Sequence, residues 1–400
     1  MNVKIIAVIV VALLAVAGVT TFVVLSQNKD TASYDSAAFE VVSRVNSEGS
    51  GLYIDKTVAN TVDGKLVRTS NGTAFFGENY SLSDANKAAW GGLILGDPGS
   101  KSIQHTQLAS IANKVGLEFK QYTTTMGEPS ANVLYYVTNL ATYETIVGDP
   151  DIKGGIVWEP QFQKVIQRSS DKYMTLALTN DIFPDHACCI VAMNHNWLQD
   201  NSAVAVKFLA GYTKAVDFIN AAKKDKTGAD YTWLVDFAKS TSSSSALTTE
   251  EVEDAIDNIT YLYADKDDGS LGDLTNGIAT LSTDLKALGA ITSDKFNDGN
   301  KFAKAFVNDS YLKDAVAGKA SKTGTDSVSV CVINGDIHQL AIHVAKEKGY
   351  FSEYGLNVTV DKVLNGNEVA GLLVSKDYMI GFLGAPPATI LTVDGEHIIV

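Results

Sequence analysis

Two stretches of the chain alternate apolar, strand-like runs with segments whose apolar residues recur at helical spacing. The first stretch extends from Phe39 to Asn194 and the second from Ser327 to Gly381. Such alternation is typical of the α/β class, in which helices connect parallel strands and cover both faces of a sheet. Residues 202–316, between the two stretches, have a helical pattern throughout. The chain is therefore expected to fold as α/β units joined by a helical block.

The positions of individual elements follow from the period of the apolar residues. In the first stretch we predict strands at 39–45, 52–54, 91–95, 117–122, 155–158 and 188–194, and helices at 102–115, 130–146 and 161–167. In the second stretch we predict strands at 327–333, 356–360 and 378–381, and helices at 339–346 and 369–374. Residues 57–85, rich in Thr, Asn and Gly, are predicted to form loops or a hairpin. The small, polar residues 317–326 predict a flexible linker.

The N-terminus carries an uncharged, apolar run from Ile5 to Leu25. A helix of ~20 apolar residues spans a bilayer, so residues 1–30 predict a single-pass membrane anchor with an extracytoplasmic domain behind it. The alternative is a cleaved signal peptide, whose apolar core is usually only ~7–15 residues, and the protein would then be secreted. Lys4 favours a cytoplasmic N-terminus.

The charge balance excludes one class of partner. The chain has 32 Lys and Arg against 46 Asp and Glu, a net charge of −14. Binding to a phosphate backbone needs clustered cations, and the sequence contains no run of five basic residues. Nucleic acid is therefore not an expected partner.

Signals for catalysis or metal binding are weak. Cys188, Cys189 and Cys331 lie in apolar runs, which predicts buried small hydrophobic residues rather than disulfides. The six His residues are scattered, and neither C-x-x-C, H-E-x-x-H, G-x-S-x-G nor a P-loop is present. We therefore expect no metal, no cofactor and no catalytic residues.

Signals for ligand binding are stronger, because several predicted strands are followed by loops of small polar residues. These loops are 47–50, 99–102, 334–338, 365–367 and 384–387. Glycine lets a backbone approach a ligand closely, Ser and Asn offer short hydrogen-bonding groups, and free N–H groups at helix starts favour anions. In open α/β sheets, ligands bind beyond the carboxyl ends of strands. The loops predict a small-ligand site, with ordinary turns as the alternative.

The second stretch resembles a known family. It contains, in order, Ala345–Phe351 (AKEKGYF), Gly355–Val358 (GLNV), Gly366–Leu373 (GNEVAGLL) and Gly384–Pro386 (GAP). This series is similar to the beginning of the solute-binding proteins that serve nitrate/sulfonate/taurine-type ABC importers. Residues 40–316 resemble the remainder of the same family, on Asn46–Ser50 (NSEGS), the segment 98–105, Trp158–Pro160 (WEP) and the helices after Ser202.

The order of the two matches is reversed relative to the family, whose beginning lies at 327–400 and whose middle and end lie at 40–316. The resemblance therefore implies a circular permutant, in which the linker 317–326 joins the family's usual ends and the new break falls in the strand before Asn46. The alternative is a truncated tandem, in which residue 327 starts a second copy. A permutant requires residues 327–400 to pack into one sheet with residues 39–54.

The resemblance also implies an architecture, the type II periplasmic-binding-protein fold, with two α/β lobes and a ligand cleft between them. Lobe I would comprise residues 31–56, 191–316 and 327–400, and lobe II would comprise residues 57–190. The residues that this family places in the cleft correspond to Glu48, Ser50, Ser100, Ser102, His105, Trp158, Glu159, Asn334, His338, Gly366, Asn367, Gly384 and Pro386.

The implied function is capture of a small ligand outside the cytoplasm and its delivery to the permease of an ABC importer. The ligand would be a sulfonate, nitrate, taurine or a related organic molecule. Glu48 and Glu159 would repel a simple anion unless they point away from it or contact a cationic part of the ligand. An organic or zwitterionic ligand is therefore an equal expectation. Two alternatives stay open: a ligand-sensing ectodomain without transport, and an enzyme similar to the pyrimidine synthases that share this fold.

Overall fold

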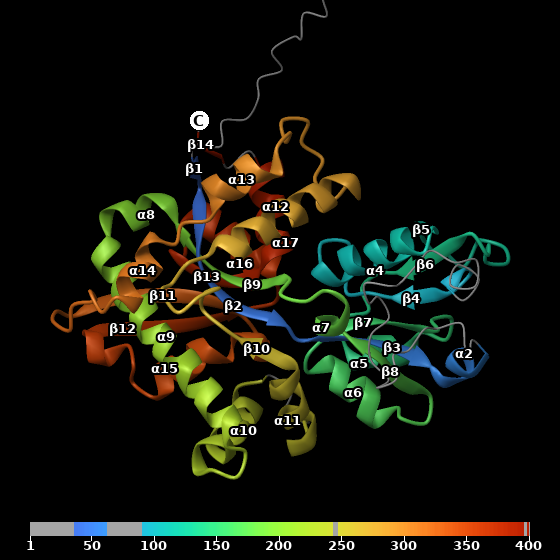
Figure 1. The fold of residues 1–400 in the computed structure, drawn as a ribbon, viewed down its shortest axis with the longest axis horizontal. Helices are drawn as coiled ribbons and strands as arrows, with labels where there is room; N and C mark the ends of the chain where they lie inside the picture. Colours follow the sequence, from blue (N-terminus) through green and yellow to red (C-terminus); the bar gives the residue numbers. More distant parts are fainter. Residues whose placement is uncertain (1–35, 62–89, 243–246, 396–397, 400) are drawn as a thin grey trace, which may run out of the picture.

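The computed structural model describes residues 36–61, 90–242, 247–395 and 398–399. Two six-stranded sheets, each covered by helices, make up this part of the chain (Figure 1). The predicted anchor and most of the segment 57–85 lie outside the described residues. Within the described residues, no helix has the length and apolar character needed to cross a membrane.

The first sheet defines lobe I, and its strand order is β10-β2-β9-β13-β11-β12. These strands are β10 (Ile259–Tyr261), β2 (Phe39–Glu48), β9 (Ala187–Asn194), β13 (Ile380–Gly384), β11 (Asp326–Ile333) and β12 (Leu356–Val363). The C-terminal stretch thus shares a sheet with β2 and is not a detached half-domain. A two-residue pairing of β1 (Ser36–Ala37) with β14 (Ile398–Ile399) adds a second contact between these parts of the chain.

Helices cover both faces of this sheet. On one face lie α12 (Gly272–Ala287), α16 (Gly366–Ser375) and α17 (Ala385–Asp394), and on the other lie α9 (Ser202–Lys224), α10 (Ala229–Thr241) and α15 (Leu340–Glu347) (Figure 1). Successive residues of β13 point to opposite faces of the sheet: Gly381 faces Val369 of α16, whereas Phe382 packs edge-on against Tyr212 of α9. The remaining elements of lobe I are α8 (His195–Asp200), α11 (Thr249–Asn258), α13 (Gly299–Phe306), α14 (Ser310–Val316), η1 (Ile337–Gln339) and η2 (Ser352–Tyr354).

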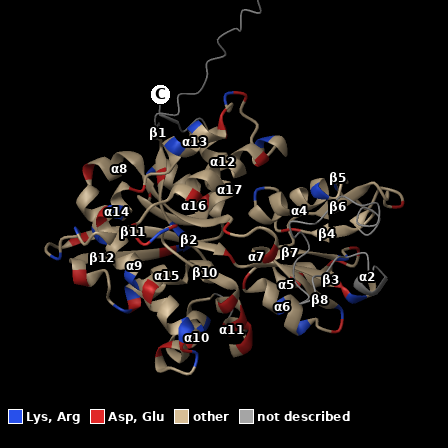
Figure 2. Ribbon diagram, viewed as in Figure 1, with Lys and Arg blue, Asp and Glu red and all other residues tan. Residues whose placement is uncertain are grey.

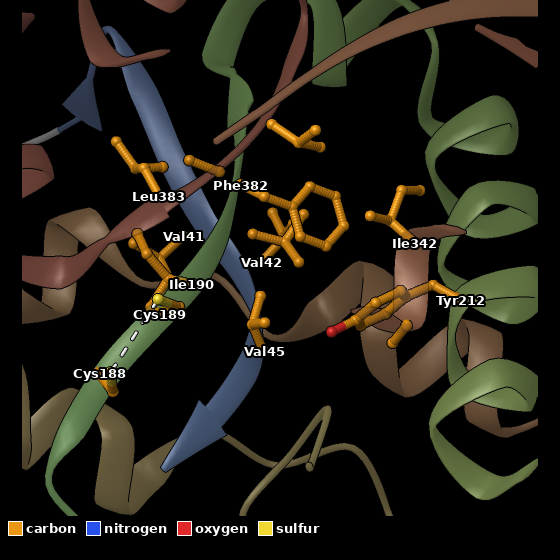
Figure 3. Close-up of a cluster of buried hydrophobic side chains, with 14 of the residues drawn as sticks. Val41, Val42, Val45, Cys188, Cys189, Ile190, Tyr212, Ile342, Phe382 and Leu383 are labelled. Carbon is orange, nitrogen blue, oxygen red and sulfur yellow. Dashed lines mark hydrogen bonds between the residues drawn. The ribbon is translucent and has the colours of Figure 1, made fainter. Parts of the chain in front are cut away.

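One continuous apolar core fills lobe I. Figure 3 shows Val42 and Val45 of β2 beside Phe382 and Tyr212, with Ile190 on the neighbouring strand β9. All five side chains are buried. The three cysteines belong to this core and are free and buried, which confirms the prediction that they are small hydrophobic residues.

Thiol titration tests this placement. Because Cys188, Cys189 and Cys331 are all buried, the folded protein is expected to react with an aromatic disulfide reagent at a small fraction of the rate of a free thiol. In denaturant all three are expected to react at once. A thiol that reacts rapidly in the folded protein would contradict the placement.

The second sheet defines lobe II, and its strand order is β5-β6-β4-β7-β3-β8. These strands are β5 (Glu118–Gln121), β6 (Val133–Val137), β4 (Ile94–Gly96), β7 (Gly154–Trp158), β3 (Ser50–Asp55) and β8 (Tyr173–Leu178). On one face α4 (Ile103–Lys114) and α7 (Thr179–Ile182) enclose a core, and on the other α5 (Tyr143–Gly148) and α6 (Gln161–Arg168) enclose another. The short helix α2 (Lys56–Thr61) follows β3.

Three sequence predictions need correction. Both sheets are mixed rather than parallel, because β9 and β3 run antiparallel to their neighbours. The helix predicted at 130–146 is the strand β6 followed by α5, since the β-branched and aromatic run Val133–Val137 pairs with β4 and β5. Both lobe boundaries shift as well: residues 50–55, which we assigned to lobe I, form β3 of lobe II, and residues 187–190, which we assigned to lobe II, begin β9 of lobe I.

Candidate functional site

The chain passes from lobe I to lobe II at Gly49, between β2 and β3. Glu48 and Gly49 both have positive φ, 67° and 86°, which redirects the strand from one sheet to the other. A Cβ on Gly49 would lie 2.3 Å from His338 Nε2, so only glycine fits here without displacement of a neighbour. The return passage runs from α7 through residues 183–186 to β9, and Arg44 Nη2 donates to Asp185 O (3.0 Å) within it.

A group of polar contacts, here called the crossover cluster, is centred on Gly49 and consists of Gly49, Glu159, Gln163, Asn258 and His338. All of these residues are buried except Asn258, which is half-buried. The Gly49 carbonyl accepts hydrogen bonds from Glu159 N (2.9 Å) and His338 Nε2 (2.8 Å). Glu159 Oε1 accepts from Gln163 Nε2 (2.9 Å) and from Asn258 Nδ2 (2.7 Å). Asn258 and His338 belong to lobe I, and Glu159 and Gln163 to lobe II. The cluster therefore ties the two lobes together.

Both ionisable members of the cluster have displaced pKa values. Complete burial raises the pKa of Glu159 to about 7, although the bonds from Asn258 and Gln163 oppose the shift. Burial alone would lower the pKa of His338, but the Asp336 carboxylate, whose Oδ1 lies 2.7 Å from His338 Nδ1, raises it to about 9. The folded protein thus favours the protonated form of both groups.

The stability of the protein is therefore expected to fall as the pH rises. A carboxyl whose pKa is higher in the folded state keeps its proton there at a pH where the unfolded chain has already lost it. The stabilisation that protonated Glu159 provides is therefore lost as the pH rises from 4.5 to about 7, and the free energy of unfolding falls by on the order of 3 kcal/mol over this range. His338 extends the decline from pH 6.5 to about 9. Urea unfolding across this range is expected to show a flatter curve between pH 5 and 7 for Glu159→Gln. An unchanged slope in this variant would contradict the assignment.

In lobe II, a second group of predicted residues lies at the start of α4. Ser102 caps the helix, because its hydroxyl accepts from His105 N (3.2 Å). His105 is buried, its Nδ1 lies 2.8 Å from Asp97 Oδ2, and its ring packs edge-on against Tyr136. Gln104 Nε2 donates to Ser50 Oγ (2.8 Å), which links this helix start to the crossover.

A third group lies in lobe I where α16 and α17 begin. A Cβ on Gly366 would lie 3.0 Å from Pro387 Cγ and 3.6 Å from Gly384 N, so the two helix starts are in close contact. Pro386 is buried in the first turn of α17, where a backbone N–H would have no partner within the helix, so its absence costs no hydrogen bond. The small side chains allow this close approach.

The remaining predicted residues differ in exposure. Ser100, Asn334 and Asn367 are exposed, and Trp158 at the end of β7 is half-buried. Glu48 is buried, burial raises its pKa, and its Oε2 accepts from Thr260 Oγ1 (2.9 Å). The structure thus brings some of the predicted residues together in three groups and leaves Ser100, Asn334 and Asn367 exposed outside them. The crossover cluster holds the two most buried ionisable residues of the predicted set, Glu159 and His338.

Sequence reasoning missed the partners that hold these residues. Asp97 and Asp336 each orient a histidine, and Asn258 holds Glu159 from the other lobe. The Asp-x-His spacing of residues 336–338 was available as a signal, whereas nothing local points from Asn258 to Glu159. Across the residues that the structure describes, no group of three His, Cys, Asp or Glu side chains is placed to hold a metal ion.

Comparisons with known proteins give two similar structures. No protein-family model matches the sequence, and no curated protein matches it. One similar structure is the ligand-binding component of an ABC-type import system from Staphylococcus aureus with zinc bound, with a TM-score of 0.41 and 15% identity, covering 70% of this chain and 75% of that chain. Another is the periplasmic nitrate-binding protein NrtA from Synechocystis PCC 6803, with a TM-score of 0.47 and 12% identity, covering 70% of this chain and 68% of that chain.

Proposed function

We propose that this chain is an extracytoplasmic solute-binding protein, which captures a small ligand between its two lobes and delivers it to the permease of an ABC importer. The observation that carries the proposal is the passage of the chain between two separate α/β sheets at Gly49, with residues of both lobes gathered around it. Two lobes joined by two short passages of chain, at residues 48–49 and 183–186, can rotate against each other, and a ligand that contacts both lobes favours one arrangement.

The ligand is proposed to contact the helix starts and exposed loop residues rather than the crossover cluster. The starts of α4, α16 and α17 offer backbone N–H groups and small side chains, including Ser102, Gly366 and Gly384. Glu159 and His338 are fully engaged with neighbours, so their proposed role is to position the lobes. Ser100, Asn334, Asn367 and Trp158 complete the proposed set.

The charges near the crossover bear on the class of ligand. Glu48 and Glu159 both lie there, and burial favours their neutral forms. Two further acidic groups, Asp97 and Asp336, each have a histidine partner. A sulfonate, nitrate, taurine or a related organic molecule is therefore proposed, bound by helix starts rather than by Lys or Arg.

The chain order is proposed to be a circular permutation of this family. The support is that β11, β12 and β13 lie in the sheet that contains β2, and that residues 317–325 connect α14 to β11. Lys207 Nζ holds this connection, because it donates to Thr323 O (2.6 Å) and to Asp326 Oδ2 (2.7 Å). Residues 1–30 are proposed to anchor the protein in the cell membrane, with the lobes outside the cytoplasm.

A thermal-shift screen of the chain without residues 1–30 tests the proposed function. The panel contains nitrate, sulfate, ethanesulfonate, taurine and heterocyclic vitamins. A true ligand is expected to raise the midpoint of unfolding progressively with concentration, as RT ln(1 + [L]/Kd) requires. A matched variant, Ser102→Ala with Asn367→Ala, is expected to weaken the shift without changing the ligand-free midpoint by more than a few degrees. Equal shifts in the two proteins would contradict the proposed contacts.

A further inference from the structure

One pair of helices, α6 of lobe II and α11 of lobe I, joins the lobes through polar side chains. On α11, Glu251, Asp254 and Asn258 are spaced so that they share one face of the helix. Figure 2 shows acidic residues gathered along α11. Each of the three residues on this face bonds to a residue of α6 or to Glu159 just before it.

The strongest of these contacts is a bidentate ion pair. Arg168 Nε donates to Glu251 Oε1 (2.5 Å) and Arg168 Nη2 donates to Glu251 Oε2 (2.7 Å). The Glu251 side chain is only 1% exposed. The guanidinium also lies 5.6 Å from the ring centroid of Tyr143. Paired, planar contacts of this kind are stronger and more directional than single ones.

The other two contacts extend the interface along both helices. Gln167 Nε2 donates to Asp254 Oδ2 (2.9 Å), and Asn258 Nδ2 donates to Glu159 Oε1 (2.7 Å). The apolar residues of these helices face elsewhere: Phe162 and Val165 lie in a core of lobe II, and Val252 lies in the core of lobe I. Separation of the two helices would therefore expose polar groups that water can satisfy, with little loss of apolar burial.

We propose that the α6–α11 contact is an interlobe latch, which holds the lobes in their present arrangement and so regulates the freedom of motion on which ligand exchange depends. This proposal rests on the proposed function, since it concerns access to the same site. Rotation of the lobes about Gly49 moves α6 relative to α11, because each helix packs on a different sheet. The latch must break for the lobes to rotate.

Hydrogen exchange of the ligand-free protein, followed by mass spectrometry, tests the latch. Two latch variants are used, Arg168→Gln and the double variant Gln167→Ala with Asp254→Asn. The peptides that report are those with residues 46–52 and 156–162, which include the bond from Glu159 N to Gly49 O. Both latch variants are expected to exchange at least threefold faster in these peptides, while peptides of β11 and β13 are unchanged.

Two control variants separate lobe motion from local fraying of α11. Thr248→Val removes the capping bond in which Thr248 Oγ1 accepts from Glu251 N. It keeps the backbone N–H that donates to Glu251 Oε2 and both side chains of the Arg168–Glu251 pair. Lys226→Gln removes an ion pair between Lys226 and Asp257 within lobe I. Neither control is expected to speed exchange at residues 46–52.

The latch is overturned if exchange at residues 46–52 is unchanged in both latch variants. It is also overturned if Thr248→Val accelerates that exchange as much as Arg168→Gln does. Because no ligand is used, failure to find a ligand in the thermal-shift screen would contradict the proposed function and leave this result unaffected.

Discussion

Replacement of Gly49 by alanine is expected to lower the free energy of unfolding by about 2–5 kcal/mol, measured by urea denaturation. The φ of +86° costs an alanine roughly 1–2 kcal/mol. The new Cβ would also lie 2.3 Å from His338 Nε2 and 2.8 Å from Ile259 Cγ1, and overpacking of this kind costs typically 1–3 kcal/mol. His338 would have to move away from the Gly49 carbonyl, so the connection between the lobes should loosen as well.

The matched control is Gly371→Ala in α16. Nothing lies within 4 Å of a Cβ built at Gly371, and alanine is favoured over glycine in a helix by about 0.8–1 kcal/mol. This variant is expected to be as stable as the parent or more so. If the two alanine variants had the same stability, the account of the crossover would be wrong.

Replacement of Arg44 by methionine is expected to cost about 3–5 kcal/mol of stability, the range for breaking a buried ion pair by removal of one partner. Arg44 Nη1 donates to Asp265 Oδ1 (2.5 Å), and the two side chains are 4% and 2% exposed. The same carboxylate accepts from Asp273 N and Leu274 N at the start of α12. Without Arg44 a buried charge is left without its counter-ion, and the return passage loses the bond to Asp185 O.

The control for this prediction is Lys226→Gln, which breaks the more exposed pair of Lys226 with Asp257. Surface ion pairs contribute about 0–1 kcal/mol, so this variant should unfold close to the parent in thermal and urea denaturation. If Arg44→Met lowered the free energy of unfolding by less than 1 kcal/mol, the Asp265 carboxylate would have to accept hydrogen bonds from water or another donor in the variant. That result would contradict the structural role assigned to the pair.

The fold of the second α/β stretch was predictable from sequence to within a few residues. The predicted elements at 327–333, 339–346 and 356–360 correspond to β11, α15 and β12. These elements have a clear apolar period and join in order, which local patterns capture. The helix predicted at 130–146 was wrong because Val133–Val137 fits both a helical spacing and a strand composition. Its pairing with β4 and β5 makes it a strand.

The candidate site was less predictable, because it depends on partners far apart in the chain. The family resemblance implied Glu48, Glu159 and His338 as ligand contacts. In the structure, Glu159 and His338 are buried and bonded across the lobes. Asn258 lies 99 positions from Glu159, and His338 lies 289 positions from Gly49. No local pattern links such residues, since only the packing of the two sheets brings them together.

Small-angle X-ray scattering during titration with the best compound of the thermal-shift panel tests the claim that a ligand favours one arrangement of the two lobes. A two-lobed binding protein is expected to show a saturable change in its radius of gyration that is complete at one equivalent, because the ligand favours one arrangement of the lobes. Binding with no change in scattering, or no binding by any compound of the panel, would contradict the claim.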